Sequence, residues 1–331
     1  MKKFLIGTLA GALALAAAGV ASAQDNNVVL QLKWVAQGQF AGYYVAQAKG
    51  FYEEEGLSVE IKPGGPDIAP EQVIAGGGAD VITTWMAAAL AARERGVPLV
   101  NIAQPFKNSG LLLTCRKDMG VESTDDFAGK TLGVWFFGNE YPFYAWMAKL
   151  GLSTEGGEDG VEVLKQAFNV DPLVQGQAAC ISTMTYNEYG QVLRAGYSEE
   201  ELTVFNYRDE GVGMLEDGLY VLEDSLEDPA FVEKMQKFVR ASMRGWAYAA
   251  ENPEEAAQIV VDNDLTGAMT LEDQVYQVNE VNKLVAGSTG VLDPADYQET
   301  VDTLLSSVSP ENPAITAEPE GAYTTVVTDG L

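Results

Sequence analysis

Aromatic rings, most of them followed by amide or carboxyl side chains, occur at the ends of four predicted strands. The four groups are Trp34 with Gln37 and Gln39, Trp85 alone, Trp135 with Asn139, Glu140 and Tyr141, and Tyr186 with Asn187 and Glu188. Ligands of α/β sheets bind at the carboxyl ends of strands, so we expect these side chains to converge on one site. Tyr43, in the helical segment that follows the first group, completes the predicted site.

These residue types suit a planar nitrogen heterocycle better than an inorganic anion. We expect Trp34, Trp135 and Tyr186 to stack on the ring or contact its edge. Asn139, Asn187 and Gln39 would form hydrogen bonds with its ring nitrogens and amino group. Glu188 or Glu140 would accept hydrogen bonds from an exocyclic amine. An anion would prefer Arg, Lys or bare helix N-termini, and the four groups contain neither base.

Each of these residues also has a purely structural interpretation. Trp85 at a strand end is typical of a core residue. Asn139 suits a helix N-cap, Glu140 suits the first turn of a helix, and Tyr186 to Glu188 read equally well as a cap. The recurrence of the pattern at four strand ends favours a site.

The sequence lacks residues that several classes of enzyme need for catalysis. The chain has no histidine, which removes imidazole bases and the usual zinc ligands, and we predict no metal, no cofactor and no catalytic residue. Gly76 to Gly78 precede a predicted strand instead of following one, which indicates a turn and not a phosphate loop. A carboxylate-based exported hydrolase stays an alternative, although acidic pairs are by default solvated surface here.

The excess of acidic residues limits which partners the protein can bind. The 331 residues include 20 basic and 48 acidic side chains, a formal charge of −28. Such a chain repels phosphates, so nucleic acid is excluded as a partner. We interpret most of the charge as solvated surface.

Hydrophobic periodicity predicts two α/β lobes. Strands over 28–34, 57–61, 80–84 and 99–104 alternate with helices over 40–54, 70–75 and 86–95, the signature of a parallel sheet covered by helices. A second alternation follows, with strands over 111–115, 131–135, 161–166 and 181–184 and helices over 140–150 and 187–195. Helices over 230–252, 254–263, 271–286 and 294–306 follow and are expected to complete the first lobe.

The predicted organisation is therefore a bilobal cleft protein. Lobe 1 comprises residues 24–106 and 217–309, and lobe 2 comprises residues 107–216. The tail over 310–331 contains three prolines and little periodicity, and we expect it to wrap loosely or to be disordered.

Residues 1–23 have the pattern of a cleaved signal peptide: two lysines, an apolar run, and Ala21-Ser22-Ala23. No cysteine follows the run, so we expect a free periplasmic protein without a lipid anchor. In that compartment Cys115 and Cys180 are either bridged or two buried thiols, and their positions in the sequence leave both open.

Several segments together resemble the periplasmic solute-binding proteins of ABC importers that are related to the thiamine-pyrimidine synthases of fungi. They are Leu32-Lys33-Trp34, Gln37 to Ala46, Lys49 to Leu57, Gly64 to Asp67, Gly96 to Gln104, Gly129 to Trp135, Gly138 to Glu140 and Met184 to Glu188. No short piece is decisive, but the ordered set, over about residues 28–225, is specific for the family.

The resemblance implies a type II periplasmic-binding fold that closes over its ligand and delivers it, as a monomer, to a membrane permease. Bacterial relatives carry formylaminopyrimidine or hydroxymethylpyrimidine, others carry riboflavin, and more distant ones carry sulfonates, taurine or nitrate. The fungal members are enzymes that need a histidine, pyridoxal phosphate, iron and a cysteine-rich motif. This chain has no histidine, and residues 210–215 hold no cysteine, so a pyrimidine carrier is expected, with a flavin-like carrier as the alternative.

Overall fold

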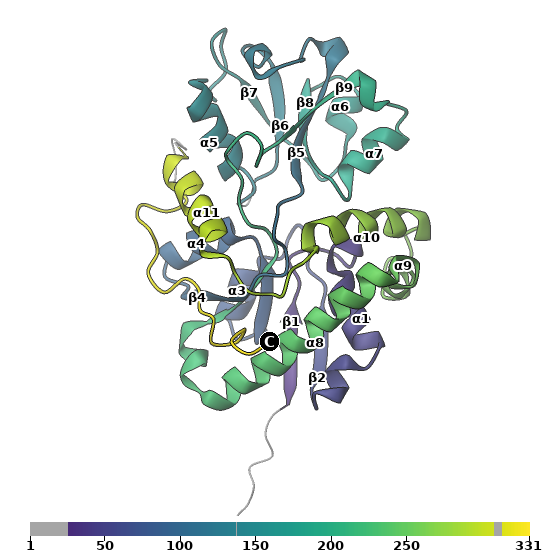
Figure 1. Ribbon diagram of the computed structural model, residues 1–331. Coiled ribbons are helices and arrows are strands. Elements are labelled where there is room, and N and C mark those ends of the chain that lie inside the picture. The colour runs from purple at the N-terminus through teal and green to yellow at the C-terminus, as the bar shows by residue number, and fades with distance from the viewer. Residues whose placement is uncertain (1–25, 137, 308–312) are drawn as a thin grey trace, which may run out of the picture.

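The computed structural model describes residues 26–136, 138–307 and 313–331, which form two lobes around one five-stranded sheet each (Figure 1). Lobe 1 has strand order β2-β1-β3-β10-β4, and lobe 2 has order β7-β6-β8-β5-β9. The first sheet consists of β1 (Asn27–Gln31), β2 (Ser58–Lys62), β3 (Val81–Thr84), β4 (Leu99–Ala103) and β10 (Gly218–Leu222). The second consists of β5 (Leu111–Arg116), β6 (Thr131–Val134), β7 (Glu162–Lys165), β8 (Cys180–Met184) and β9 (Leu202–Asn206). The predicted bilobal α/β class is confirmed.

Each sheet is mixed, so the prediction of a purely parallel sheet is wrong. β10 runs antiparallel to β3 and β4, and β5 runs antiparallel to β8 and β9. Both reversed strands follow a segment in which the chain crosses between the lobes, residues 104–110 before β5 and 207–217 before β10. A strand that enters a lobe from the cleft starts where the parallel strands end, and it must therefore run the other way. Neither β9 nor β10 is among the predicted strands.

Helices cover both sheets and agree with most predicted segments. They are α1 (Ala41–Ala48), α2 (Phe51–Glu54), α3 (Pro70–Ala75), α4 (Met86–Glu94), α5 (Tyr141–Leu150), α6 (Asp171–Val174), α7 (Glu188–Arg194), α8 (Pro229–Glu251), α9 (Pro253–Asp262), α10 (Leu271–Val285) and α11 (Pro294–Ser306). The helix predicted over 40–54 is two helices, because Gly50 adopts φ 72°, a left-handed conformation that ends α1. Within the described ranges, none of the helices has the length and apolar character needed to span a bilayer.

Lobe 1 is built on the crossing of α1 and α8. At this crossing a Cβ on Gly245 would lie 2.0 Å from the Gly42 carbonyl oxygen, so the two backbones approach as closely as glycine alone permits. The Trp246 ring beside it lies edge-on to Tyr43 and Phe106, with centroids 5.5 Å and 5.7 Å away. Helices α8, α9 and α10 complete lobe 1, whereas α11 contacts both α4 of lobe 1 and α5 of lobe 2 (Figure 1).

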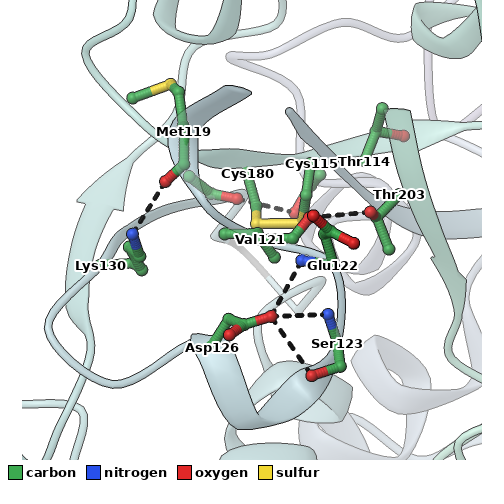
Figure 2. Close-up of a disulfide and its surroundings, with 12 residues drawn as sticks. Thr114, Cys115, Met119, Val121, Glu122, Ser123, Asp126, Lys130, Cys180 and Thr203 are labelled. Atoms are coloured by element: carbon green, nitrogen blue, oxygen red, sulfur yellow. Dashed lines mark hydrogen bonds between the residues drawn. A yellow bond between two sulfur atoms is a disulfide. The ribbon is translucent and has the colours of Figure 1, made fainter. Parts of the chain in front are cut away.

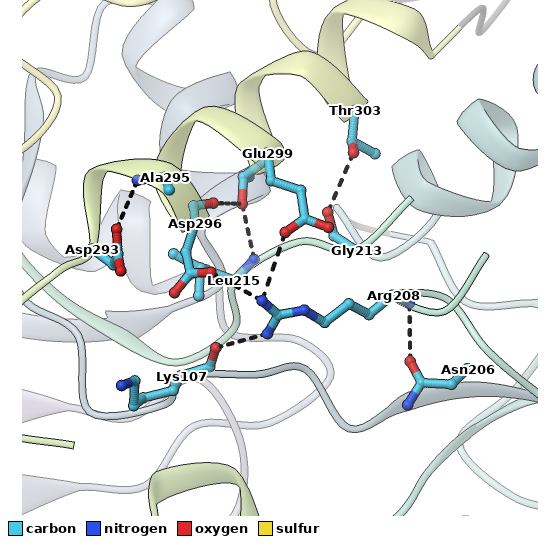
Figure 3. A network of polar contacts seen from close by, with 11 residues as sticks. Lys107, Asn206, Arg208, Gly213, Leu215, Asp293, Ala295, Asp296, Glu299 and Thr303 are labelled. Atoms are coloured by element: carbon cyan, nitrogen blue, oxygen red, sulfur yellow. Dashed lines mark hydrogen bonds and ion pairs between the residues drawn. The ribbon is translucent and has the colours of Figure 1, made fainter. Parts of the chain in front are cut away.

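One arginine links α11 to both chain crossings (Figure 3). Arg208, in the returning crossing, forms ion pairs with Asp296 at 3.0 Å and Glu299 at 3.8 Å and donates a hydrogen bond to the Lys107 carbonyl oxygen at 3.3 Å. A second hydrogen bond links the returning crossing to α11, since the Leu215 N–H donates to the Thr300 hydroxyl at 3.0 Å. The predicted lobe boundaries fall within these crossings and stay predictions.

The described part of the tail packs on lobe 1, so the expectation of a loose or disordered tail is wrong for residues 313–331. The Asn101 N–H donates to the Ala322 carbonyl oxygen, and the Thr324 N–H donates to the Asn101 carbonyl oxygen. Ile315 and Val327 are buried. The tail thus covers the free edge of β4 with isolated apolar anchors, which leave no periodic signal in the sequence.

The two cysteines form a disulfide, the alternative that the sequence left open (Figure 2). Cys115 on β5 and Cys180 on β8 face each other in the antiparallel register. They are 65 residues apart in the chain, and both are fully buried. The bridge therefore closes a long loop within the core of lobe 2.

Replacing both cysteines with alanine is expected to lower the free energy of unfolding by about 2–4 kcal/mol, because the unfolded chain loses the constraint of the closed loop. Urea denaturation, with and without reductant, measures the loss. Reductant should destabilise the natural protein and leave the double variant unchanged. Equal stability of the oxidised and reduced natural protein would contradict the prediction.

Candidate functional site

A cavity of about 380 Å³ lies between the lobes, beside the carboxyl ends of strands in both sheets. Lobe 1 contributes Lys33, Trp34, Gln37, Gln39, the segment Gly65–Glu71 and Trp85. Lobe 2 contributes Trp135, Phe136, Asn139, Phe168, Met184, Tyr186, Asn187 and Glu188. Six of the twenty lining residues are aromatic, and eight carry polar or charged side chains.

Eight of the eleven predicted site residues line this cavity. They are Trp34, Gln39, Trp85, Trp135, Asn139, Tyr186, Asn187 and Glu188. The fold thus brings together predicted residues that are up to about 150 positions apart in the chain. Their contact with a ligand stays a prediction.

Three predicted residues, Tyr43, Glu140 and Tyr141, do not line the cavity. Tyr43 points from α1 into the core of lobe 1, against Trp246. Tyr141 is buried in a cluster formed with residues of α4 and α11. Glu140 accepts a hydrogen bond from the Gly138 N–H at 2.8 Å and so braces the turn before α5. Helical spacing indicated a buried face for Tyr43 but not which neighbour that face meets. The position of Glu140 and Tyr141 after a predicted strand did not decide where their side chains point.

The aromatic wall spans both lobes. The Trp34 and Phe168 ring centroids are 4.4 Å apart, and Phe168 is stacked on Trp135 at 6.2 Å with an interplanar angle of 29°. Trp34 lies three residues beyond the end of β1, not at the end of the strand as predicted. Phe168 was missed because it lies in a loop after β7, where no periodicity marks it. The three rings thus form one continuous aromatic surface on which a flat ligand could stack.

Glu188 is the buried carboxylate of the cavity, with 5 % of its surface exposed. Its Oε2 accepts from the Met184 N–H at 3.1 Å, and its Oε1 accepts from Asn187 Nδ2 at 2.9 Å. Burial raises the pKa of Glu188 to about 7, and the hydrogen bonds oppose that rise. The group is therefore poised between its neutral and charged forms near neutral pH.

Two buried polar atoms of cavity residues have no hydrogen-bond partner among the described residues: Trp85 Nε1 and Asn139 Oδ1. One is a donor from lobe 1, and the other is an acceptor from lobe 2. Buried polar atoms are nearly always paired in folded proteins, so these two are unusual among the residues that line the cavity. Asn187, by contrast, already accepts from Gln191 and Gln277 and donates to Glu188.

Lys33 is a basic residue of the cavity, so the expectation that the site contains no base is wrong. It lines the cavity, and its Nζ lies 5.0 Å from the centroid of the Trp85 ring. The signal was its position directly before Trp34. Asp67, Glu71 and Glu188 line the same cavity, so carboxylates outnumber the ammonium group there. Within the described ranges, no cluster of His, Cys, Asp or Glu is placed to hold a metal ion.

The lobes are in contact across the cleft. Tyr276 Oη, on α10 of lobe 1, donates to the Thr185 carbonyl oxygen of lobe 2 at 2.8 Å. Arg194 of α7 forms an ion pair with Asp273 at 2.9 Å. A Cβ on Gly138 would lie 3.0 Å from the Ala88 Cβ, so α4 and the turn before α5 approach closely. These contacts describe a closed arrangement of the two lobes.

The raised pKa of Glu188 predicts a pH-dependent contribution to stability. Between about 4.5 and about 7, the folded protein keeps a proton on Glu188 that the unfolded chain has lost. The free energy of unfolding therefore falls through this window as pH rises, and Glu188→Gln should remove that part of the fall. Urea unfolding at a series of pH values tests this, with the exposed Glu53→Gln as control. Parallel profiles for the natural protein and Glu188→Gln would contradict it.

Similar proteins and structures agree with this architecture. The formylaminopyrimidine-binding protein of Halalkalibacterium halodurans is 24 % identical over 328 residues, 95 % of this chain and 97 % of the relative. The riboflavin-binding protein RibY of Chloroflexus aurantiacus is 28 % identical over 266 residues, 76 % and 71 % of the two chains. A relative from Legionella pneumophila, 26 % identical over 72 % of this chain and 74 % of its own length, is a 4-amino-5-hydroxymethyl-2-methylpyrimidine phosphate synthase.

Among solved structures, the periplasmic aliphatic sulphonate binding protein SsuA from Escherichia coli shares the fold. It superimposes with a TM-score of 0.66 at 12 % identity and covers 89 % of this chain and 90 % of its own. The family model described as NMT1/THI5 like matches residues 37–256. Because that match extends over more than half of the sequence, the chain belongs to the NMT1/THI5-like family.

Proposed function

We propose that this protein is the periplasmic substrate-binding component of an ABC importer that captures a pyrimidine precursor of thiamine. Formylaminopyrimidine or hydroxymethylpyrimidine would be the ligand. The observation that carries the proposal is the cavity between the lobes, where rings from both lobes enclose a buried carboxylate and two unpaired polar atoms.

The polar groups complement an aminopyrimidine ring. The continuous wall of Trp34, Phe168 and Trp135 would stack on one face of the ring. Glu188 would accept a hydrogen bond from the exocyclic amine, and a protonated ring would strengthen that contact. Trp85 Nε1 would donate to a ring nitrogen, and Asn139 Oδ1 would accept from an amino or formamide N–H.

The proposed role is transport and not turnover. The chain contains no histidine, and the relatives named as binding proteins support a carrier, although the relative from Legionella pneumophila is named as a synthase. Residues 1–23, the predicted signal peptide, lie outside the described residues. Export to the periplasm, a monomeric state, a permease partner and the absence of nucleic-acid binding all belong to the proposal.

A riboflavin carrier is the second candidate. It is favoured by the continuous aromatic wall of Trp34, Phe168, Trp135 and Phe136, and by the similarity to RibY. A sulfonate carrier is less well supported, because carboxylates outnumber the ammonium group of Lys33 in the cavity.

Isothermal titration calorimetry with 4-amino-5-hydroxymethyl-2-methylpyrimidine, formylaminopyrimidine and riboflavin distinguishes the candidates. We expect heat with at least one pyrimidine and a concentration-dependent rise in melting temperature, since ligand at 100 times its Kd adds about 2.7 kcal/mol to stability. Tight riboflavin binding without heat from either pyrimidine would replace the first candidate by the second.

Trp34→Leu is expected to weaken binding of the preferred ligand by about tenfold or more, because stacking and burial of the ring are lost together. The matched control is Phe51→Leu, an aromatic residue of lobe 1 that contacts Tyr248 and not the cavity. Calorimetry measures both variants. Unchanged affinity of Trp34→Leu would show that the ligand binds elsewhere.

A further inference from the structure

A chain of three buried polar side chains leads from the cavity wall into lobe 1. Gln37 Nε2 donates to Gln39 Oε1 at 2.6 Å, and Gln39 Nε2 donates to Asp217 Oδ2 at 2.5 Å. Gln37 and Gln39 line the cavity, whereas Asp217 is fully buried behind them. The carboxylate therefore reaches the ligand site only through the two amides.

Asp217 occupies an unusual position in the backbone. It ends the returning crossing, directly before β10, and within the described ranges it is the one non-glycine residue with positive φ, 32°. Such conformations are costly and persist where the surroundings require them. Its second oxygen, Oδ1, is buried and has no partner among the described residues.

The chemistry of the three groups determines their orientation. An ionised carboxylate only accepts hydrogen bonds, so the amide edge of Gln39 that faces Asp217 must be the NH₂ group. The Gln39 oxygen then faces Gln37 and must receive the NH₂ group of that residue. Gln37 Oε1 is thus left as an acceptor, and no described residue donates to it.

We propose that Asp217 is a positioning residue that orients both amides, so that Gln37 presents a carbonyl oxygen to the ligand and the site selects a hydrogen-bond donor there. The pyrimidine named in the test rests on the proposed function, whereas the orientation of the amides does not. A protonated Asp217 could donate instead of accept, which would permit the reversed orientation of both amides.

The buried surroundings of Asp217 favour the protonated form of its carboxyl group. Burial, without a charged partner in direct contact, raises the pKa of the Asp217 carboxyl. Several titratable groups influence it or are influenced by it through space: Lys33, Tyr43, Tyr186, Glu216 and Tyr220. The neighbouring Glu216 is also buried, but it accepts from Ser109 Oγ and the Gly110 N–H and is not part of the amide chain.

The first test needs no ligand. Side-chain amide resonances of Gln37 are followed by ¹H–¹⁵N NMR in the ligand-free protein as the pH is lowered from neutral. We expect them to shift with pH in the natural protein and in the exposed control Glu53→Gln, and to lose the shift in Asp217→Asn, which tolerates positive φ. Gln39→Leu interrupts the chain and should abolish the shift as well, and it carries the test if Asp217→Asn does not fold. Gln37 resonances that titrate in the same way in all these variants would overturn the proposal.

The second test measures selectivity. Calorimetry compares 4-amino-5-hydroxymethyl-2-methylpyrimidine with its 4-oxo analogue, which lacks the amino donor. The natural protein and the exposed control Glu53→Gln should prefer the amino compound by about tenfold or more, and Asp217→Asn should bring the two affinities to within a few fold. An unchanged ratio in Asp217→Asn would overturn the proposal. If the natural protein binds neither compound, the proposed function fails, and the NMR test still decides the role of Asp217.

Discussion

The two crossings between the lobes, residues 104–110 and 207–217, are joined by one buried carboxylate. Glu216 Oε2 accepts from Ser109 Oγ at 2.9 Å and from the Gly110 N–H at 3.0 Å. Gln104 adds a second link, because its Nε2 donates to the Glu216 carbonyl oxygen. The cavity walls come from both lobes, so the geometry of the site depends on how these crossings hold the lobes together. On the outer side, Arg208 continues the same connection to α11 (Figure 3).

This arrangement places acidic groups where charge is costly. Glu188, Glu216 and Asp217 are all buried, in a chain whose other acidic residues are mostly solvated. Their hydrogen bonds come from backbone N–H groups, a hydroxyl and amides, and burial raises the pKa of each. A molecule that carries donors into the cavity would meet Glu188 directly and Asp217 through Gln37 and Gln39, which relates the buried acids to the chemistry of the ligand.

The local sequence predicted most helices and strands because their signals are local. Pro70 at the start of α3 and the apolar spacing of α8 are readable without any neighbour. The reversal of β5 and β10 and the packed tail were not readable, because each depends on a segment distant in the chain. The break at Gly50, by contrast, has a local signal in the glycine itself. Eight predicted residues line the cavity, since strand ends of one sheet share an edge whatever the connections between them.

The sequence by itself determined the class of the protein: two α/β lobes, a strongly acidic surface, no imidazole chemistry, and aromatic and amide side chains at strand ends. Tertiary structure alone decided that Tyr43 and Tyr141 belong to the core, that Phe168 and Lys33 join the site, and that Cys115 meets Cys180. The physical reason is that periodicity reports whether a face is buried, whereas the identity of the neighbour that buries it is set by how distant segments pack.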